Sequence, residues 1–76
     1  MTKAFYIIFN TTHSTMKANK LLKSNYDTEV VPAPKELSKS VCSIAVKTSH
    51  ISSKEKILII LNQNNLKILN ETVLYH

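Results

Sequence analysis

The chain has 76 residues, of which 43% are hydrophobic and 20% are charged, and its formal net charge is +5. This length and composition predict one globular domain, residues 1–76, and exclude a catalytic domain joined to a separate substrate domain. A single cysteine excludes an intramolecular disulfide and a zinc site closed by the thiolates of one chain.

The first elements are a strand and a helix. Residues 4–9, AFYIIF, are aromatic and β-branched and therefore predict a strand. Thr11 or Thr12 is a suitable N-cap for the segment that follows, where apolar residues recur at helical spacing. We expect this helix to stop at Asn25, because asparagine tolerates the left-handed backbone conformation.

The middle of the chain predicts two further strands. Residues 28–31 form the second strand, which Pro32 and Pro34 end because proline has no backbone N–H to donate to a sheet. Residues 41–47, VCSIAVK, predict the third strand, and the chain's only cysteine lies in it.

The last elements are again a helix and a strand. The run from Ser52 to Glu55 fits a capping box, which opens a strongly apolar helix that ends at Asn64 and Asn65. Residues 66–75 predict the fourth strand.

The order of the elements is therefore β-α-β-β-α-β. It predicts an α+β fold, a two-layer sandwich of the ferredoxin-like type with an antiparallel four-stranded sheet and both helices on one face. A rival interpretation makes residues 34–40 a true helix and gives a β-α-β-α-β-β sandwich.

In the βαββαβ topology, the first two strands run in the same direction and the third returns between them. The ends of the first two strands, the start of the third strand and the start of the first helix then share one edge of the sheet. Segments that are distant in the sequence would therefore meet there. The residues expected at this edge are Thr11, Thr12, His13, Ser14, Pro32, Ala33, Pro34, Lys35 and Cys42.

Two interpretations of Cys42 remain open. The thiolate is the reactive form of cysteine, and its pKa falls near a helix N-terminus, a lysine or a protonated histidine, so His13 and Lys35 would favour reactivity. By strand alternation, however, Cys42 shares a face with Ile44 and Val46, which resembles the core face, and free cysteine often packs as a small hydrophobic residue.

Other function classes find less support. Nucleic-acid binding is disfavoured because the chain has no arginine and because Phe5 and Phe9 alternate onto one face, which leaves mainly Tyr6 to stack on bases. Cys42 and the histidines show no metal-ligand spacing, and we expect neither a metal nor another cofactor. The N-terminal apolar run is too short for a membrane span or a signal peptide, so we expect a cytoplasmic protein.

The order of these motifs resembles a known group. An aromatic strand leads into a Thr/Ser-His step and a helix, TTHSTMKANKLLK, and a Pro-x-Pro loop with a basic residue leads to a cysteine, VVPAPKELSKSVCSIAVK. This arrangement over residues 4–47 resembles the small bacterial family described as putative selenium/sulfur carrier protein-like. That family usually has arginine at the position of Lys35 and glycine at the position of Ser43.

The resemblance implies a sulfur or selenium carrier rather than an enzyme. Cys42 would hold the chalcogen as a persulfide or its selenium analogue, and Pro32, Pro34, Lys35 and Ser43 would shape the site. The implied partners are a sulfur or selenium donor, such as a cysteine desulfurase, and an acceptor enzyme. No cofactor is implied.

The alternative is a small protein-interaction or oligomerisation module with a structural cysteine. Its basis is the core-facing alternation of Cys42 and the presence of edge strands that would pair between chains in a homodimer. Loss of activity in a Cys42→Ser variant would separate the two hypotheses.

Overall fold

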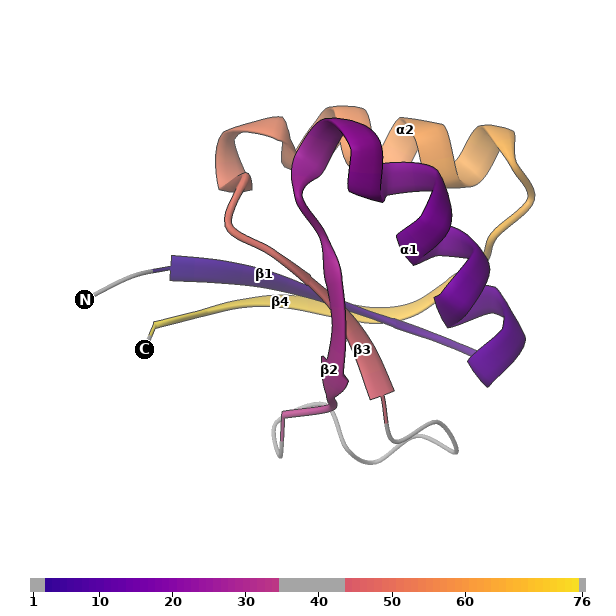
Figure 1. Cartoon of the computed structure of the whole chain (residues 1–76), viewed down its shortest axis with the longest axis horizontal. Helices are drawn as coiled ribbons and strands as arrows, with labels where there is room; N and C mark the ends of the chain where they lie inside the picture. Colours follow the sequence, from indigo (N-terminus) through magenta and orange to yellow (C-terminus); the bar gives the residue numbers. More distant parts are fainter. Residues whose placement is uncertain (1–2, 35–43, 76) are drawn as a thin grey trace.

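The computed structural model describes residues 3–34 and 44–75 (Figure 1). Four strands and two α-helices follow one another in the predicted βαββαβ order, with a short 3₁₀ turn before the second α-helix. The elements are β1 (Lys3–Phe9), α1 (Thr12–Tyr26), β2 (Glu29–Pro32), β3 (Ile44–Thr48), η2 (Ile51–Ser53), α2 (Lys54–Gln63) and β4 (Ile68–Tyr75). No helix in the described ranges is long and apolar enough to cross a membrane.

The strands form one antiparallel sheet in the order β2-β3-β1-β4. Both α-helices cover the same face of this sheet (Figure 1). Because β3 is antiparallel to both of its neighbours, β1 and β2 run in the same direction with β3 between them. The prediction of a two-layer βαββαβ sandwich is confirmed. The extra helix that the βαβαββ rival places at residues 34–40 lies, apart from Pro34, outside the described residues.

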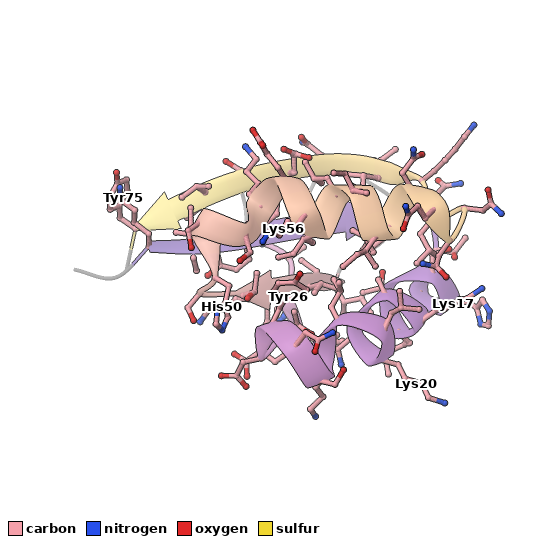
Figure 2. All side chains as sticks on the ribbon, turned by 90° about the horizontal axis from the view of Figure 1, so that it is seen from above. Lys17, Lys20, Tyr26, His50, Lys56 and Tyr75 are labelled. Atoms are coloured by element: carbon pink, nitrogen blue, oxygen red, sulfur yellow. The ribbon has the colours of Figure 1, made fainter. Side chains whose placement is uncertain are left out.

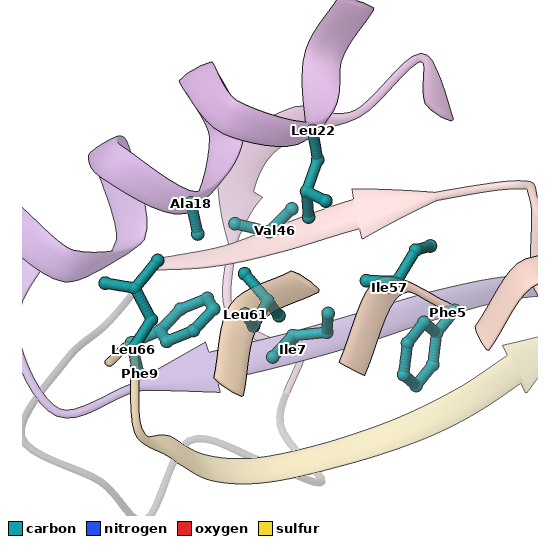
Figure 3. Close-up of a cluster of buried hydrophobic side chains, with 9 residues drawn as sticks. All are labelled: Phe5, Ile7, Phe9, Ala18, Leu22, Val46, Ile57, Leu61 and Leu66. Atoms are coloured by element: carbon teal, nitrogen blue, oxygen red, sulfur yellow. The ribbon is translucent and has the colours of Figure 1, made fainter. Parts of the chain in front are cut away.

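The main core lies between the sheet and the two helices (Figure 3). Alternate residues of β1 point into it, as the period of two in a strand requires. Residues spaced three or four apart on α1 and α2 close it from above. The cluster consists of Phe5, Ile7, Phe9, Ala18, Leu22, Val46, Ile57, Leu61 and Leu66.

A second apolar cluster lies on the opposite face of the sheet, here called the distal face. It contains Ala4, Tyr6, Ile8 and Ala45, and each of these residues is buried. Tyr6 exposes only 4% of its surface, so the idea that it could stack on nucleic-acid bases is wrong. Strand β1 is thus apolar on both faces, as expected for a central strand buried on both sides.

The helix ends differ from the sequence-based expectations. Helix α1 passes Asn25 and ends at Tyr26, with Asp27 as its C-cap in the left-handed region at φ 50° and ψ 52°. The predicted capping box at the second helix does not form, because Ser53 is the N-cap and makes no side-chain capping bond. Backbone N–H groups at the start of a helix need acceptors, and the preceding 3₁₀ turn supplies one of them. The Ser53 N–H donates to the His50 carbonyl at 3.1 Å.

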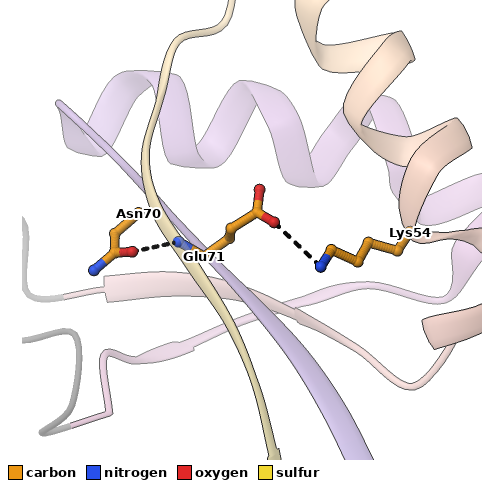
Figure 4. A network of polar contacts seen from close by, with 3 residues as sticks. All are labelled: Lys54, Asn70 and Glu71. Atoms are coloured by element: carbon orange, nitrogen blue, oxygen red, sulfur yellow. Dashed lines mark hydrogen bonds and ion pairs between the residues drawn. The ribbon is translucent and has the colours of Figure 1, made fainter.

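Polar contacts join α2 to the sheet (Figure 4). The Lys54 Nζ lies 3.4 Å from the Glu71 Oε1 in β4 and 5.5 Å from the centre of the Phe5 ring. Both side chains of the ion pair are partly exposed, which limits the contribution of the pair to about 0.5 kcal/mol. This contact directs Glu71 toward the helical layer.

Candidate functional site

The register of the sheet determines which segments meet at the predicted site. Ile7 pairs with Val46, and Pro32 pairs with Ile44. The C-terminal ends of β1 and β2 therefore lie at the same edge of the sheet as the N-terminal end of β3. We call this end of the sheet, where β1 and β2 end and β3 begins, the entry edge. The start of β3 lies there between Pro32 on one side and the β1–α1 turn on the other.

Helix α1 begins at the entry edge with a complete N-cap. The Thr11 backbone is extended, at φ −137° and ψ 157°, and its Oγ1 accepts a hydrogen bond from the Ser14 N–H at 3.1 Å. The Thr11 Oγ1 also donates to the Ser14 Oγ at 3.0 Å, and the Thr15 Oγ1 donates to the Thr11 carbonyl at 3.0 Å. The prediction of an N-cap at Thr11 or Thr12 is confirmed, with Thr11 in that role.

The first turn of α1 is an electropositive feature of the entry edge. It contains no acidic residue, so the partial positive charge of the helix terminus is not offset within the helix. Thr12 and His13 are exposed in this turn, and Ser14 is half-buried. No hydrogen bond or ion pair joins His13 to Pro32 or Pro34 in the described ranges, so these residues share an edge without a direct polar contact.

Several predicted site residues fall outside the described part of the chain. They are Lys35, Cys42 and Ser43. Of the Pro-x-Pro loop, Pro32 is the exposed last residue of β2, and Pro34 is half-buried. Ala33, between the two prolines, packs against the cluster of the distal face.

A basic residue that the sequence analysis did not single out also lies near this edge. Lys67 comes directly before β4, and with Asn10, Ile68 and Leu69 it lines a shallow hollow of about 220 Å³. Phe9 pairs with Ile68, so the hollow lies at the same end of the sheet as the α1 N-terminus. Strand β4 lies two strands from β3, which corresponds to about 10 Å. The sequence carries no signal for Lys67, because its place at this end of the sheet depends on the pairing of β4 with β1.

A larger hollow, of about 440 Å³, lies at the opposite end of the β2–β3 hairpin. The Lys47 Nζ approaches the Glu29 Oε1 to 3.9 Å there, with both side chains substantially exposed. Nearby, the rings of Tyr26 and His50 meet edge to face with centroids 6.2 Å apart (Figure 2). This larger hollow has charges of both signs and lies away from the entry edge, so it is distinct from the predicted cysteine site. The lining residues are Lys23, Asp27, Thr28, Glu29, Lys47, Thr48 and Ser49.

Two lysines of α1, Lys17 and Lys20, line neither of these hollows. Lys17 and Lys20 are exposed and extend from the helix into solvent (Figure 2). They carry part of the net charge of +5 on the helical layer. Exposed charges of this kind raise the rate of encounter with an acidic partner more than they raise affinity.

Comparison with known proteins identifies a family to which the chain is similar. Residues 4–71 match the family described as "Putative Se/S carrier protein-like". The matched range contains both helices, nearly all of the sheet and the position of Cys42. No curated protein and no solved structure matches the chain. The chain therefore belongs to the putative Se/S carrier protein-like family.

Proposed function

We propose that this protein carries sulfur or selenium on the thiol of Cys42 and passes it to an acceptor enzyme. The observation that carries the proposal is the family match over residues 4–71, a range that includes the only cysteine of the chain. A carrier needs one thiol and no cofactor, since the donor and the acceptor supply the rest of the chemistry. The protein is then a relay and not an enzyme.

The loading step is a transfer of sulfane sulfur without net oxidation. The Cys42 thiolate attacks the outer sulfur of a persulfide on a donor such as a cysteine desulfurase. A new sulfur–sulfur bond forms at Cys42, and the sulfur–sulfur bond of the donor breaks. The donor cysteine leaves as a thiolate. Delivery repeats the exchange in the other direction, with an acceptor nucleophile attacking the outer atom and Cys42 leaving.

The fold supports this chemistry through the entry edge. Cys42 precedes Ile44 by two residues, and two residues of extended chain span about 7 Å at most. The capped N-terminus of α1 begins at the same edge and contributes partial positive charge, which favours a thiolate over a thiol. The residues that we propose to shape the site are Thr12, His13, Ser14, Pro32, Pro34, Lys35 and Ser43.

The chemistry also bears on where the protein works. A cysteine that alternates between thiol and persulfide needs a reducing compartment, because oxidation would compete with loading. We place the carrier in the cytoplasm on this ground. Its exposed lysines, including Lys17 and Lys20, would steer it to an acidic surface on the donor.

The test is to load the protein from a cysteine desulfurase supplied with free cysteine. Intact-mass spectrometry should then show one added sulfur atom, and peptide mapping should locate it at Cys42. Cyanide should release the atom as thiocyanate and restore the original mass. Replacing cysteine with selenocysteine in the same reaction identifies the preferred cargo.

The matched control is Cys42→Ser, which keeps a polar side chain of similar size and removes the nucleophile. It should gain no mass under the same conditions. An active desulfurase that leaves the native protein unmodified would refute the carrier function. In that case the interaction module with a structural cysteine becomes the better interpretation, and the folded native thiol should also resist a small alkylating agent.

A further inference from the structure

The two outermost strands of the sheet, β2 and β4, differ in how well they are protected against pairing with another chain. Strand β2, at one edge, is four residues long, begins with a charged residue and ends in a proline. Strand β4, at the other edge, is eight residues long, and in the described ranges it pairs with β1 alone. A long edge strand presents unpaired backbone N–H and C=O groups to any strand that approaches it.

The sequence of β4 contains few of the features that normally prevent such pairing. Lysine and proline are the usual blocking residues, and β4 has neither, although the chain has ten lysines. Its one charged residue, Glu71, forms the ion pair with Lys54 at 3.4 Å (Figure 4). The strand therefore brings little uncompensated charge to an interface, despite the net charge of the whole chain.

Two large apolar side chains remain exposed along this strand. Leu69 exposes 50% of its surface and Tyr75 exposes 59%. A register shift leaves Leu69 as the extra residue of a bulge, between the pairs that Ile68 and Asn70 make with β1. The bulge is confined to the N-terminal end of the strand, so the stretch that follows is regular and open to pairing.

The spacing of these residues is self-complementary. Leu69 and Tyr75 are equally distant in sequence from Thr72, one on each side. In an antiparallel pair of two β4 strands with Thr72 at the centre, Leu69 of each copy lies opposite Tyr75 of the other. Glu71 then lies opposite Val73, and the two copies of Glu71 do not oppose each other. A centre at Glu71 would place two carboxylates face to face.

We propose that the protein forms a two-fold symmetric homodimer by antiparallel pairing of β4 with β4, centred on Thr72. Two four-stranded sheets then join into one continuous sheet, and both exposed apolar residues are covered at each end of the junction. The interface is isologous, as in most soluble dimers. Because a single strand pair buries little area, the dimer belongs to the weaker class of interfaces and dissociates on dilution.

The test uses opposite charges at the symmetry centre. Wild-type protein should show a concentration-dependent dimer by sedimentation equilibrium, in reducing buffer and equally in a Cys42→Ser background, which excludes a disulfide-linked dimer. Thr72→Lys and Thr72→Glu each place like charges opposite each other and should weaken dimerisation by about tenfold. Thr72→Val keeps a β-branched side chain and should dimerise like the wild type.

An equimolar mixture of Thr72→Lys and Thr72→Glu should regain a dimer, since lysine then faces glutamate across the two-fold axis. Added salt should weaken this mixed dimer. A wild-type protein that stays monomeric at all accessible concentrations would overturn the proposal, as would a Thr72→Lys protein that dimerises unchanged. Failure of the mixture to recover a dimer would overturn the register centred on Thr72. None of these outcomes depends on whether Cys42 carries a chalcogen.

Discussion

Replacing Ile8 with alanine removes three carbon atoms from a side chain that is fully buried on the distal face of the sheet. At about 0.8 kcal/mol per carbon, the lost transfer free energy is about 2.4 kcal/mol, before any cost of the cavity. Cavity terms bring such substitutions to about 2–5 kcal/mol. In a domain of this size, a loss of about 2.4 kcal/mol lowers the melting temperature by roughly 10–20 °C.

The assay is urea unfolding followed by far-UV circular dichroism, with linear extrapolation to water. Ile7→Ala is the matched comparison, because Ile7 is the next residue of β1 and is equally buried, but on the helix-covered face. Ile59→Ala is the surface control, since Ile59 exposes 56% of its area and should lose only about 0.5 kcal/mol. If alanine prevents folding, Ile8→Val should still cost about 0.5–1.5 kcal/mol.

Equal losses at Ile7 and Ile8 would show that both faces of β1 are packed in solution. A loss at Ile8 no greater than that at Ile59 would refute the reasoning, because it would mean that the distal face is open to water. A one-sided sheet would then describe the fold better.

Substitutions also test three local features of the fold. Thr11→Ala removes the N-cap of α1 and should cost about 1 kcal/mol in urea unfolding, whereas Thr12→Ala, next to the cap, should cost much less. Asp27→Gly should match or exceed the wild type in melting temperature, and Asp27→Ala should fall about 1 kcal/mol below Asp27→Gly, because only the left-handed conformation at φ 50° separates them. Thr48→Val removes the buried hydroxyl that donates to the Tyr26 carbonyl at 2.7 Å and should cost about 1–3 kcal/mol; an unchanged midpoint would mean that water replaces the bond.

The order and type of the elements could be predicted from the sequence because they depend on local properties. The aromatic and β-branched run at 4–9 prefers a strand in almost any context, and the threonines after it satisfy a helix start through bonds within a few residues. Family membership was equally accessible, since the Pro-x-Pro loop and the following cysteine are sequence features. The candidate site around Cys42 likewise follows from the sequence as a set of residues, and it stays a prediction.

Local signals were not sufficient at the helix ends. Asn25 and Asp27 both tolerate the left-handed conformation, and the position of the stop depends on tertiary contacts, because Thr28 bonds to Asn19 and Thr48 bonds to the Tyr26 carbonyl. The predicted capping box from Ser52 to Glu55 failed for a similar reason. The 3₁₀ turn before α2 changes the geometry at Ser53, and local spacing alone does not reveal it.

The βαββαβ topology already predicted that the ends of β1 and β2 share an end of the sheet with the start of β3, whereas the strand register and the burial of individual side chains came only from the tertiary structure. The amino-acid sequence places Cys42 between the Pro-x-Pro motif and β3, whereas the pairing of Pro32 with Ile44 and of Phe9 with Ile68 decided which segments lie at the same end of the sheet as the start of β3. It also decided that Tyr6 is buried and that β4 forms an edge of the sheet. The physical reason is that strand pairing joins residues far apart in the chain, so its outcome depends on the packing of the whole sheet and not on the preference of any one segment.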